Sequence, residues 1–167
     1  MTVGSSFIPM RRKDREITEI EAIRAILDKA KVLHLAMIDG ARPYVVPMNY
    51  GYALAAGRLT LYLHGAKEGR KLDVLQQNDR VAFVLETDVS PVSGGDIPCK
   101  YGEAYASVMG EGTAVLLDDP VQKIEALQIL MKTQTGREFA FTPAMAESVA
   151  VIRVNVDSFT AKARPMA

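Results

Sequence analysis

A histidine at the end of an apolar stretch, followed by a basic turn, is the part of this sequence best suited to bind a ligand. The stretch Leu61–His64 leads into a turn with two glycines, and Arg70–Gln77 has the composition of a short helix. A helix N-terminus offers unpaired N–H groups and a partial positive charge, which favour a phosphate. Cationic donors would be added by Lys67, Arg70 and Lys71. The segment matches neither a Walker loop nor a dinucleotide fingerprint, and taken alone it fits a solvated basic turn equally well.

Length and composition indicate one folded domain. The chain has 167 residues, 49% of them hydrophobic, and a formal net charge of zero, which is not the composition of a disordered chain. The balanced charge gives no reason to expect nucleic acid or an acidic membrane as a partner, and no apolar run approaches the roughly 20 residues that span a bilayer. The single cysteine, Cys99, cannot form an internal disulfide, which favours a reducing, cytoplasmic location. Residues 1–10 are expected to form a disordered leader.

The pattern of apolar residues predicts many strands and few helices. Besides 70–77, one helix is expected from a capping box at Thr18–Glu21 to about Lys31, and another from Asp119-Pro120 to Gly136. Strands are expected at 32–38, 44–52, 59–64, 80–87, 100–117 and 149–156, the last continuing to 162 beyond a bend. The intervening residues 88–98 are expected to be a loop. Strands in hairpin order with helices only at separated points favour an antiparallel barrel over a doubly wound parallel sheet.

Pro47 interrupts the second of these strands. Proline cannot donate to a β-ladder, so this position predicts an edge, a bulge or a bend in the strand.

Several motifs, in their order and spacing, are similar to those of one known family. They are Arg42–Tyr50 and Leu61–Lys71, supported by Met10–Glu16, Pro98–Tyr101, Tyr105–Gly112 and Ala150–Val154. From about Met10 to Lys162 the sequence resembles the 5-nitroimidazole resistance (Nim) family, within the pyridoxamine 5'-phosphate oxidase-like flavoproteins. The resemblance implies a mainly β (α+β) fold, namely a six-stranded antiparallel split barrel with flanking helices over residues 11–167, and a homodimer.

The resemblance also implies an FMN in a cleft between two subunits. Its phosphate would be held by Lys67, Arg70 and Lys71. The second expected strand would run beneath the isoalloxazine ring through Val46, Pro47, Met48 and Asn49, with backbone groups near the polar edge of that ring. Ser107 would approach the phosphate or the ribityl chain, and the partner subunit would supply the rest. His64 occupies the position of a histidine that the family retains near the cofactor; it is expected to contact flavin or substrate, the alternative being a strand-end histidine bonded to the neighbouring loop.

The implied activity is hydride transfer from reduced flavin to an electron-poor acceptor, with NAD(P)H or another donor reducing the flavin. A nitroaromatic, 5-nitroimidazole-like molecule is the acceptor that the resemblance favours. Histidine exchanges protons near neutral pH, so His64 is the candidate catalytic proton donor. Two other functions stay open: a non-catalytic flavin-binding protein, and a haem-binding split barrel in which the basic residues pair with propionates. A deazaflavin is a further possible cofactor.

Some residues depart from the family pattern or have no assigned chemistry. Gly65 stands where the family often carries serine, which would remove one hydroxyl donor to the phosphate. The C-terminus lacks the arginine–histidine signature of true pyridoxamine phosphate oxidases and the chain has no tryptophan, so vitamin B6 oxidation is not expected. Two histidines and one cysteine without ligand spacing predict no metal site. His34 is expected to be structural and Cys99 to be buried and inert, while Tyr101 and Tyr105 fit either the cleft or the core.

Overall fold

The computed structural model describes residues 10–165, so the expected leader falls, apart from Met10, outside the described residues. Two 3-10 turns are present, at Lys13–Arg15 and Pro98–Lys100. The helices are α1 (Ile20–Lys29), α2 (Arg70–Gln77), α3 (Pro120–Thr135) and α4 (Pro143–Glu147). The strands are β1 (Glu16–Ile17), β2 (Val32–Asp39), β3 (Arg42–Ala55), β4 (Arg58–Gly65), β5 (Arg80–Val92), β6 (Gly102–Leu117) and β7 (Ala150–Arg164).

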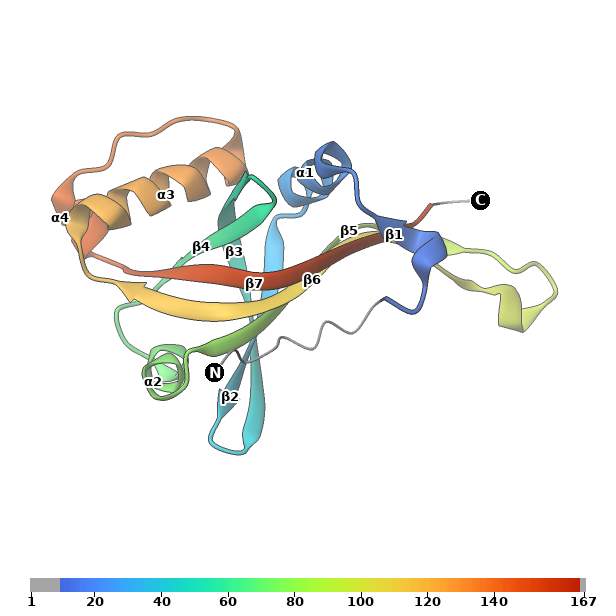
Figure 1. Ribbon diagram of the computed structural model, residues 1–167, viewed down its shortest axis with the longest axis horizontal. Coiled ribbons are helices and arrows are strands. Elements are labelled where there is room, and N and C mark those ends of the chain that lie inside the picture. The colour runs from blue at the N-terminus through green and yellow to red at the C-terminus, as the bar shows by residue number, and fades with distance from the viewer. Residues whose placement is uncertain (1–9, 166–167) are drawn as a thin grey trace.

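Six long strands close into a ring (Figure 1). Their order is β7-β4-β3-β2-β5-β6, every neighbouring pair is antiparallel, and β6 returns to pair with β7. The short β1 adds to β7 beside Lys162 and Ala161. The predicted mainly β split barrel with flanking helices is therefore confirmed.

Alternating residues place the hydrophobic core inside the ring. In β4, Leu59, Leu61 and Leu63 are at most 2% exposed, whereas Tyr62 and His64 face outward and stay partly exposed. Burial of each such leucine contributes roughly 1.5–3 kcal/mol. The same alternation fixes which side chains of every strand can reach a ligand outside the barrel.

Strand β3 changes its partner halfway along its length. Arg42–Asn49 pairs with β2, and Tyr50–Ala55 pairs with β4. Within residues 10–165, no strand pairs with the other edge of Arg42–Asn49. Pro47 lies in this half, where an edge tolerates its missing N–H, so the predicted strand edge at Pro47 is confirmed.

Helices α1 and α3 are fixed to β3 where it changes partner. The hydroxyl of the fully buried Tyr50 lies 2.7 Å from the carbonyl oxygen of Leu27 and 3.2 Å from that of Ala30, at the C-terminal end of α1. Gln134, in the last turn of α3, donates to the Tyr50 carbonyl at 2.7 Å. Helix α3 lies across β3 and β4 on the outside of the barrel (Figure 1).

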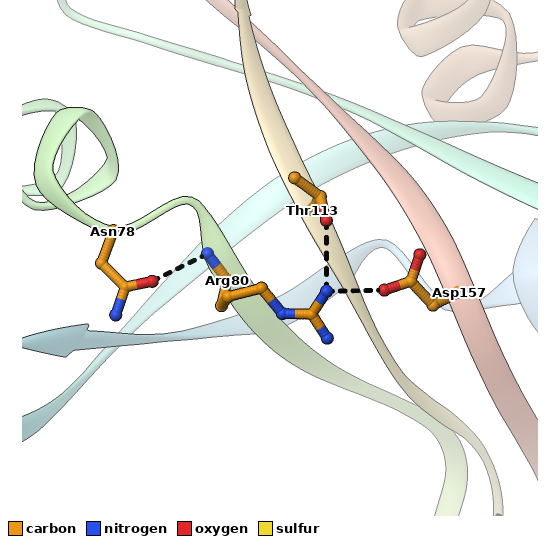
Figure 2. A network of polar contacts seen from close by, with 4 residues as sticks. All are labelled: Asn78, Arg80, Thr113 and Asp157. Atoms are coloured by element: carbon orange, nitrogen blue, oxygen red, sulfur yellow. Dashed lines mark hydrogen bonds and ion pairs between the residues drawn. The ribbon is translucent and has the colours of Figure 1, made fainter. Parts of the chain in front are cut away.

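An arginine joins three strands on another side of the barrel (Figure 2). The backbone N–H of Arg80 donates to Asn78 Oδ1 at 3.1 Å, and its Nη1 donates to Thr113 of β6 at 3.4 Å and to Asp157 of β7 at 2.9 Å. The register skips Asp157, because Glu111 pairs with Ser158 and Gly112 with Val156. Asp157 is thus the extra residue of a β-bulge, and the ion pair holds the bend that lets β7 continue.

Local sequence signals misplaced some element boundaries. The predicted capping box at Thr18 is wrong, because α1 begins after Glu19 without a side-chain cap. The predicted loop over 88–98 is wrong in its first part, since β5 runs to Val92 through a register shift between Thr87 and Ser90. Helix α4 was not predicted; its start is capped by Thr142, whose hydroxyl accepts from Met145 N–H. No helix within residues 10–165 has the length and apolar character to cross a bilayer.

Replacing Tyr50 with phenylalanine is expected to lower the free energy of unfolding by about 1–2 kcal/mol, because buried carbonyls at the end of α1 lose their donor. Chemical denaturation measures this change. Tyr101→Phe is the matched control, since the Tyr101 hydroxyl donates to Gly95 O from a side chain that is 56% exposed. Equal effects of the two substitutions would contradict the structural role of Tyr50.

Candidate functional site

The open edge of β3 faces the end of β4 and the start of α2. Strand β4 separates from β3 after the Tyr50–Leu63 pair, so His64 and Gly65 lie beyond the paired region. The region bounded by Arg42–Asn49 of β3, by His64 and Gly65, and by the N-terminus of α2 is here named the barrel split. Its unpaired strand edge offers backbone N–H and C=O groups to a ligand.

The N-terminus of α2 is available to an anion. Gly69 caps the helix with φ +128° and without a side-chain hydrogen bond. Leu72 and Asp73 donate back to the Gly69 carbonyl, so the helix itself uses neither the N–H of Arg70 nor that of Lys71. Two unused donors and the helix dipole together suit a phosphate.

Arg70 is committed to the β2–β3 hairpin. Its Nη2 and Nε lie 2.7 and 2.9 Å from Asp39 Oδ2, and its guanidinium carbon lies 4.2 Å from the centroid of the Tyr44 ring. The Asp39 carboxylate neutralises much of the positive charge of Arg70, which the sequence analysis assigned to phosphate binding. The sequence analysis did not identify Asp39 and Tyr44 as partners of Arg70. Asp39 lies 31 positions from Arg70 in the chain, and an Asp-Gly pair indicates only a turn.

Lys67 is also paired with a carboxylate, though more loosely. Its Nζ lies 3.9 Å from Glu147, and the buried Lys123 reaches the same carboxylate at 3.6 Å. Glu147 thereby joins the basic turn to the end of α4 and to α3. A phosphate at the turn would compete with Glu147 for Lys67.

Lys71 is the best-placed cation of the three. Within residues 10–165, no carboxylate lies within ion-pair distance of its Nζ. A Cβ atom at Gly65 would stand 2.7 Å from Lys71 Cε and 2.8 Å from Nζ. Gly65 thus leaves room for the lysine side chain beside the backbone of β4.

The four predicted residues of β3 divide between two faces. Val46 and Met48 pack toward the core, with Met48 only 9% exposed, while Pro47 and Asn49 face outward. The side chain of Asn49 already donates to the carbonyl of Lys31 at 3.0 Å. Val46 and Met48 can therefore meet a ligand only through their backbone.

His64 lies against a small apolar pocket between β4, α3 and α4. The pocket has a volume of about 240 Å³ and is lined by His64 and Ser148 together with Leu127, Leu130, Met131, Phe141, Met145 and Val149. Nδ1 of His64 is buried and has no partner among residues 10–165. A buried polar atom without a partner is costly, so this nitrogen lacks the hydrogen bond that buried polar groups usually have. The alternative in which a neighbouring loop satisfies the ring is not seen for Nδ1.

Ser107 is not brought to the barrel split in the single chain. It is 7% exposed and pairs in register with Glu86 of β5 and Lys162 of β7. Its partner Lys162 lies 11 positions along β7 from Val151, the residue that pairs with His64. A contact between Ser107 and a ligand at the split would therefore need a second copy of the chain.

The remaining candidate residues lie elsewhere. The expectation that Cys99 is buried is wrong, because it is exposed in the turn Pro98–Lys100. Tyr101 is also exposed. His34 is 39% exposed on the outward face of β2, with Nδ1 3.8 Å from Glu86.

Comparison with known proteins places these features in a family. A family model described as pyridoxamine 5'-phosphate oxidase matches residues 19–163. The crystal structure of a candidate 5-nitroimidazole antibiotic resistance protein from Bacteroides thetaiotaomicron is 32% identical, with a TM-score of 0.74 over 89% of this chain and 86% of that chain. No curated protein gives a significant match.

Two structures with lower identity share the fold alone. The flavocytochrome Anf3 from Azotobacter vinelandii is 20% identical, with a TM-score of 0.74 over 96% of this chain and 74% of that one. The FAD and heme binding protein from Mycobacterium smegmatis is 18% identical, with a TM-score of 0.73 over 89% and 73%.

Removing Lys71 is expected to weaken FMN binding more than removing Arg70. A charge-assisted hydrogen bond contributes about 1.5–3 kcal/mol, so Lys71→Ala should raise the FMN Kd by about tenfold or more. Arg70→Ala should have the smaller effect, since its guanidinium already pairs with Asp39. Quenching of flavin fluorescence measures both constants, and a larger loss with Arg70→Ala would refute this ranking.

Proposed function

The chain belongs to the pyridoxamine 5'-phosphate oxidase family, and on that premise we propose that it is an FMN-dependent reductase of small electron-poor acceptors, including nitroaromatics. The observation that carries the flavin assignment is the barrel split. There a helix N-terminus without a side-chain cap, a lysine with no carboxylate partner among residues 10–165 and an open strand edge lie together. When bound, FMN supplies the hydride-transfer chemistry, and the protein supplies binding, orientation and exclusion of water.

The residues of the split fit the parts of FMN. Lys71 and the first N–H groups of α2 would hold the phosphate, with Lys67 joining as it leaves Glu147. The unpaired backbone of Val46–Asn49 would hydrogen-bond the polar edge of the flavin ring. The inward-facing side chains of Val46 and Met48 do not prevent this, because only backbone groups take part. A deazaflavin carrying the same phosphate would use the same groups, and a non-catalytic flavin-binding protein would share them as well.

His64 and the apolar pocket behind it suit the acceptor. The pocket volume of about 240 Å³ admits a single small ring. We favour flavin over haem at the split itself, because the unused N–H groups at the start of α2 suit a phosphate. The imidazole of His64, which lines this pocket, would orient the acceptor and deliver a proton to it. Nitroimidazole-like acceptors are the favoured class because of the 32% identical resistance protein.

We further propose a homodimer formed through the outward face of β2, β3, β5 and β6. The register aligns Pro47, His34, Val84 and Met109 across these strands, and four apolar side chains on this face are 41–53% exposed, namely Val32, Ile38, Val45 and Met109. A contiguous exposed apolar face marks an interaction site. Because Pro47 and Ser107 both belong to its strands, a second copy docked here would carry its Ser107 toward the cofactor. The exposed single cysteine fits a reducing, cytoplasmic setting.

Loss of the imidazole is expected to impair turnover more than cofactor binding. His64→Ala should lower the kcat for NAD(P)H-dependent reduction of a 5-nitroimidazole by about a hundredfold, the usual contribution of a general acid, with the FMN Kd nearly unchanged. His64→Gln keeps a hydrogen-bonding side chain without an exchangeable proton near neutral pH. Full activity of either variant would remove His64 from proton transfer.

The protein as purified is expected to show flavin absorbance and to release FMN on heating, and dilution that dissociates the dimer should release the flavin too. The reason is that the second copy completes the cofactor site. Absorbance, mass analysis of the released molecule and light scattering measure these quantities together. A Soret band would favour the haem-binding alternative, and a monomer that retains all its FMN would refute the shared site.

A further inference from the structure

A second cavity is lined by the ends of β5 and β7 and the start of β6. These strand ends lie away from α2 (Figure 1). A β-bulge opens the cavity: the β5–β6 register shifts between Thr87 and Ser90, and Asp88 takes the left-handed region with φ +57°. The cavity has a volume of about 590 Å³ and is lined by residues 88–90, 104–106 and 163–165. That volume falls in the range of sites for nucleotide-sized ligands. The flavin assignment makes no use of it.

Arg164 forms a charged part of the cavity wall, and its position depends on a glycine. A Cβ atom at Gly102 would stand 2.2 Å from Arg164 Nη1 and 3.1 Å from Cζ. The guanidinium therefore lies directly on the backbone of β6. No carboxylate within residues 10–165 is within ion-pair distance of it, so its fork of donors is free to bind an anion.

Tyr105, which also lines the cavity, stands among further cations. Lys162 Nζ lies 5.7 Å from the centroid of the Tyr105 ring. A hydrogen bond from Arg15, together with the charges of Lys162, Arg15 and Arg12, lowers the pKa of the Tyr105 phenol. The lowered pKa of Tyr105 thus indicates a positive electrostatic potential at the mouth of the cavity.

The carboxylates at this end do not cancel that potential. Asp88, the only acid in the cavity lining, is paired with Lys29. Asp14 is paired with Arg12 at 2.5 Å, and Glu16 stands opposite Lys162 in the β1–β7 pair. Of the charged side chains that line the cavity, Arg164 is therefore the one without an opposite partner within residues 10–165.

We propose that this cavity binds the phosphate groups of a nucleotide. Arg164 and Tyr105 contact the phosphates, and Arg15 and Lys162 contribute positive electrostatic potential. The shared chemistry is a nucleoside diphosphate. In the proposed dimer the partner copy brings its cavity to the cofactor together with its Ser107, which follows Ala106 of the cavity lining. The diphosphate there has two sources: a nicotinamide dinucleotide that reduces the flavin, or the adenosine diphosphate part of FAD. The site itself is independent of the proposed reaction, because binding needs no turnover.

Isothermal titration of ADP into the purified full-length protein tests the site. Arg164→Ala should raise the ADP Kd by about tenfold or more, since it removes a charge-assisted contact. Gly102→Ala should raise it as well, by pushing aside the flexible end of Arg164 without removing any charge. The matched control is Arg58→Ala, an exposed arginine in the β3–β4 hairpin, which should leave the Kd unchanged.

Two further measurements separate the sources. If the diphosphate belongs to the reductant, Arg164→Ala raises the KM for NAD(P)H with kcat unchanged; if it belongs to FAD, the variant weakens FAD binding and leaves FMN binding intact. Either outcome supports the site. Absence of saturable ADP binding to the wild-type protein, or the same Kd in wild type and Arg164→Ala, would overturn it, whatever the fate of the flavin assignment.

Discussion

The exchange of partners along β3 is the constraint on which the rest of this structure depends. Up to Asn49 the strand belongs with β2, and from Tyr50 onward it belongs with β4. A strand that serves two neighbours in succession leaves one edge of each half without a strand partner in residues 10–165. Helix α3 hydrogen-bonds this edge in the second half, and a buried tyrosine and two helix ends fix the point of exchange. The unpaired backbone at the split follows directly from this arrangement, and so does the tolerance for Pro47.

Charge pairing then decides which cations can serve a ligand. Sequence analysis gave three basic residues the same role, yet Asp39 engages Arg70, and Glu147 engages Lys67. Only Lys71 reaches the split without a carboxylate partner within the described part of the chain. A cationic site is therefore defined less by its basic residues than by the acids folded against them.

Irregular strand positions shape both ends of the barrel. The bulge at Asp157, held by Arg80, bends β7 so that it can continue along β6 (Figure 2). The bulge at Asp88 interrupts the β5–β6 ladder and opens the second cavity. At each bulge one strand carries an extra residue, which interrupts the β-ladder and places polar groups at that point.

The sequence by itself determined the barrel, the basic turn and the family, because alternation of apolar residues, turn chemistry and motif spacing are local properties. It predicted α2 at its observed bounds, and at Pro47 it predicted an edge, a bulge or a bend, of which the structure shows the edge. Only the tertiary structure decided that Arg70 and Lys67 are paired, that Val46 and Met48 face inward, that Cys99 is exposed and that Ser107 lies away from the split. Each of these depends on residues distant in the chain or on strand register, where a shift of one position reverses the face of every side chain.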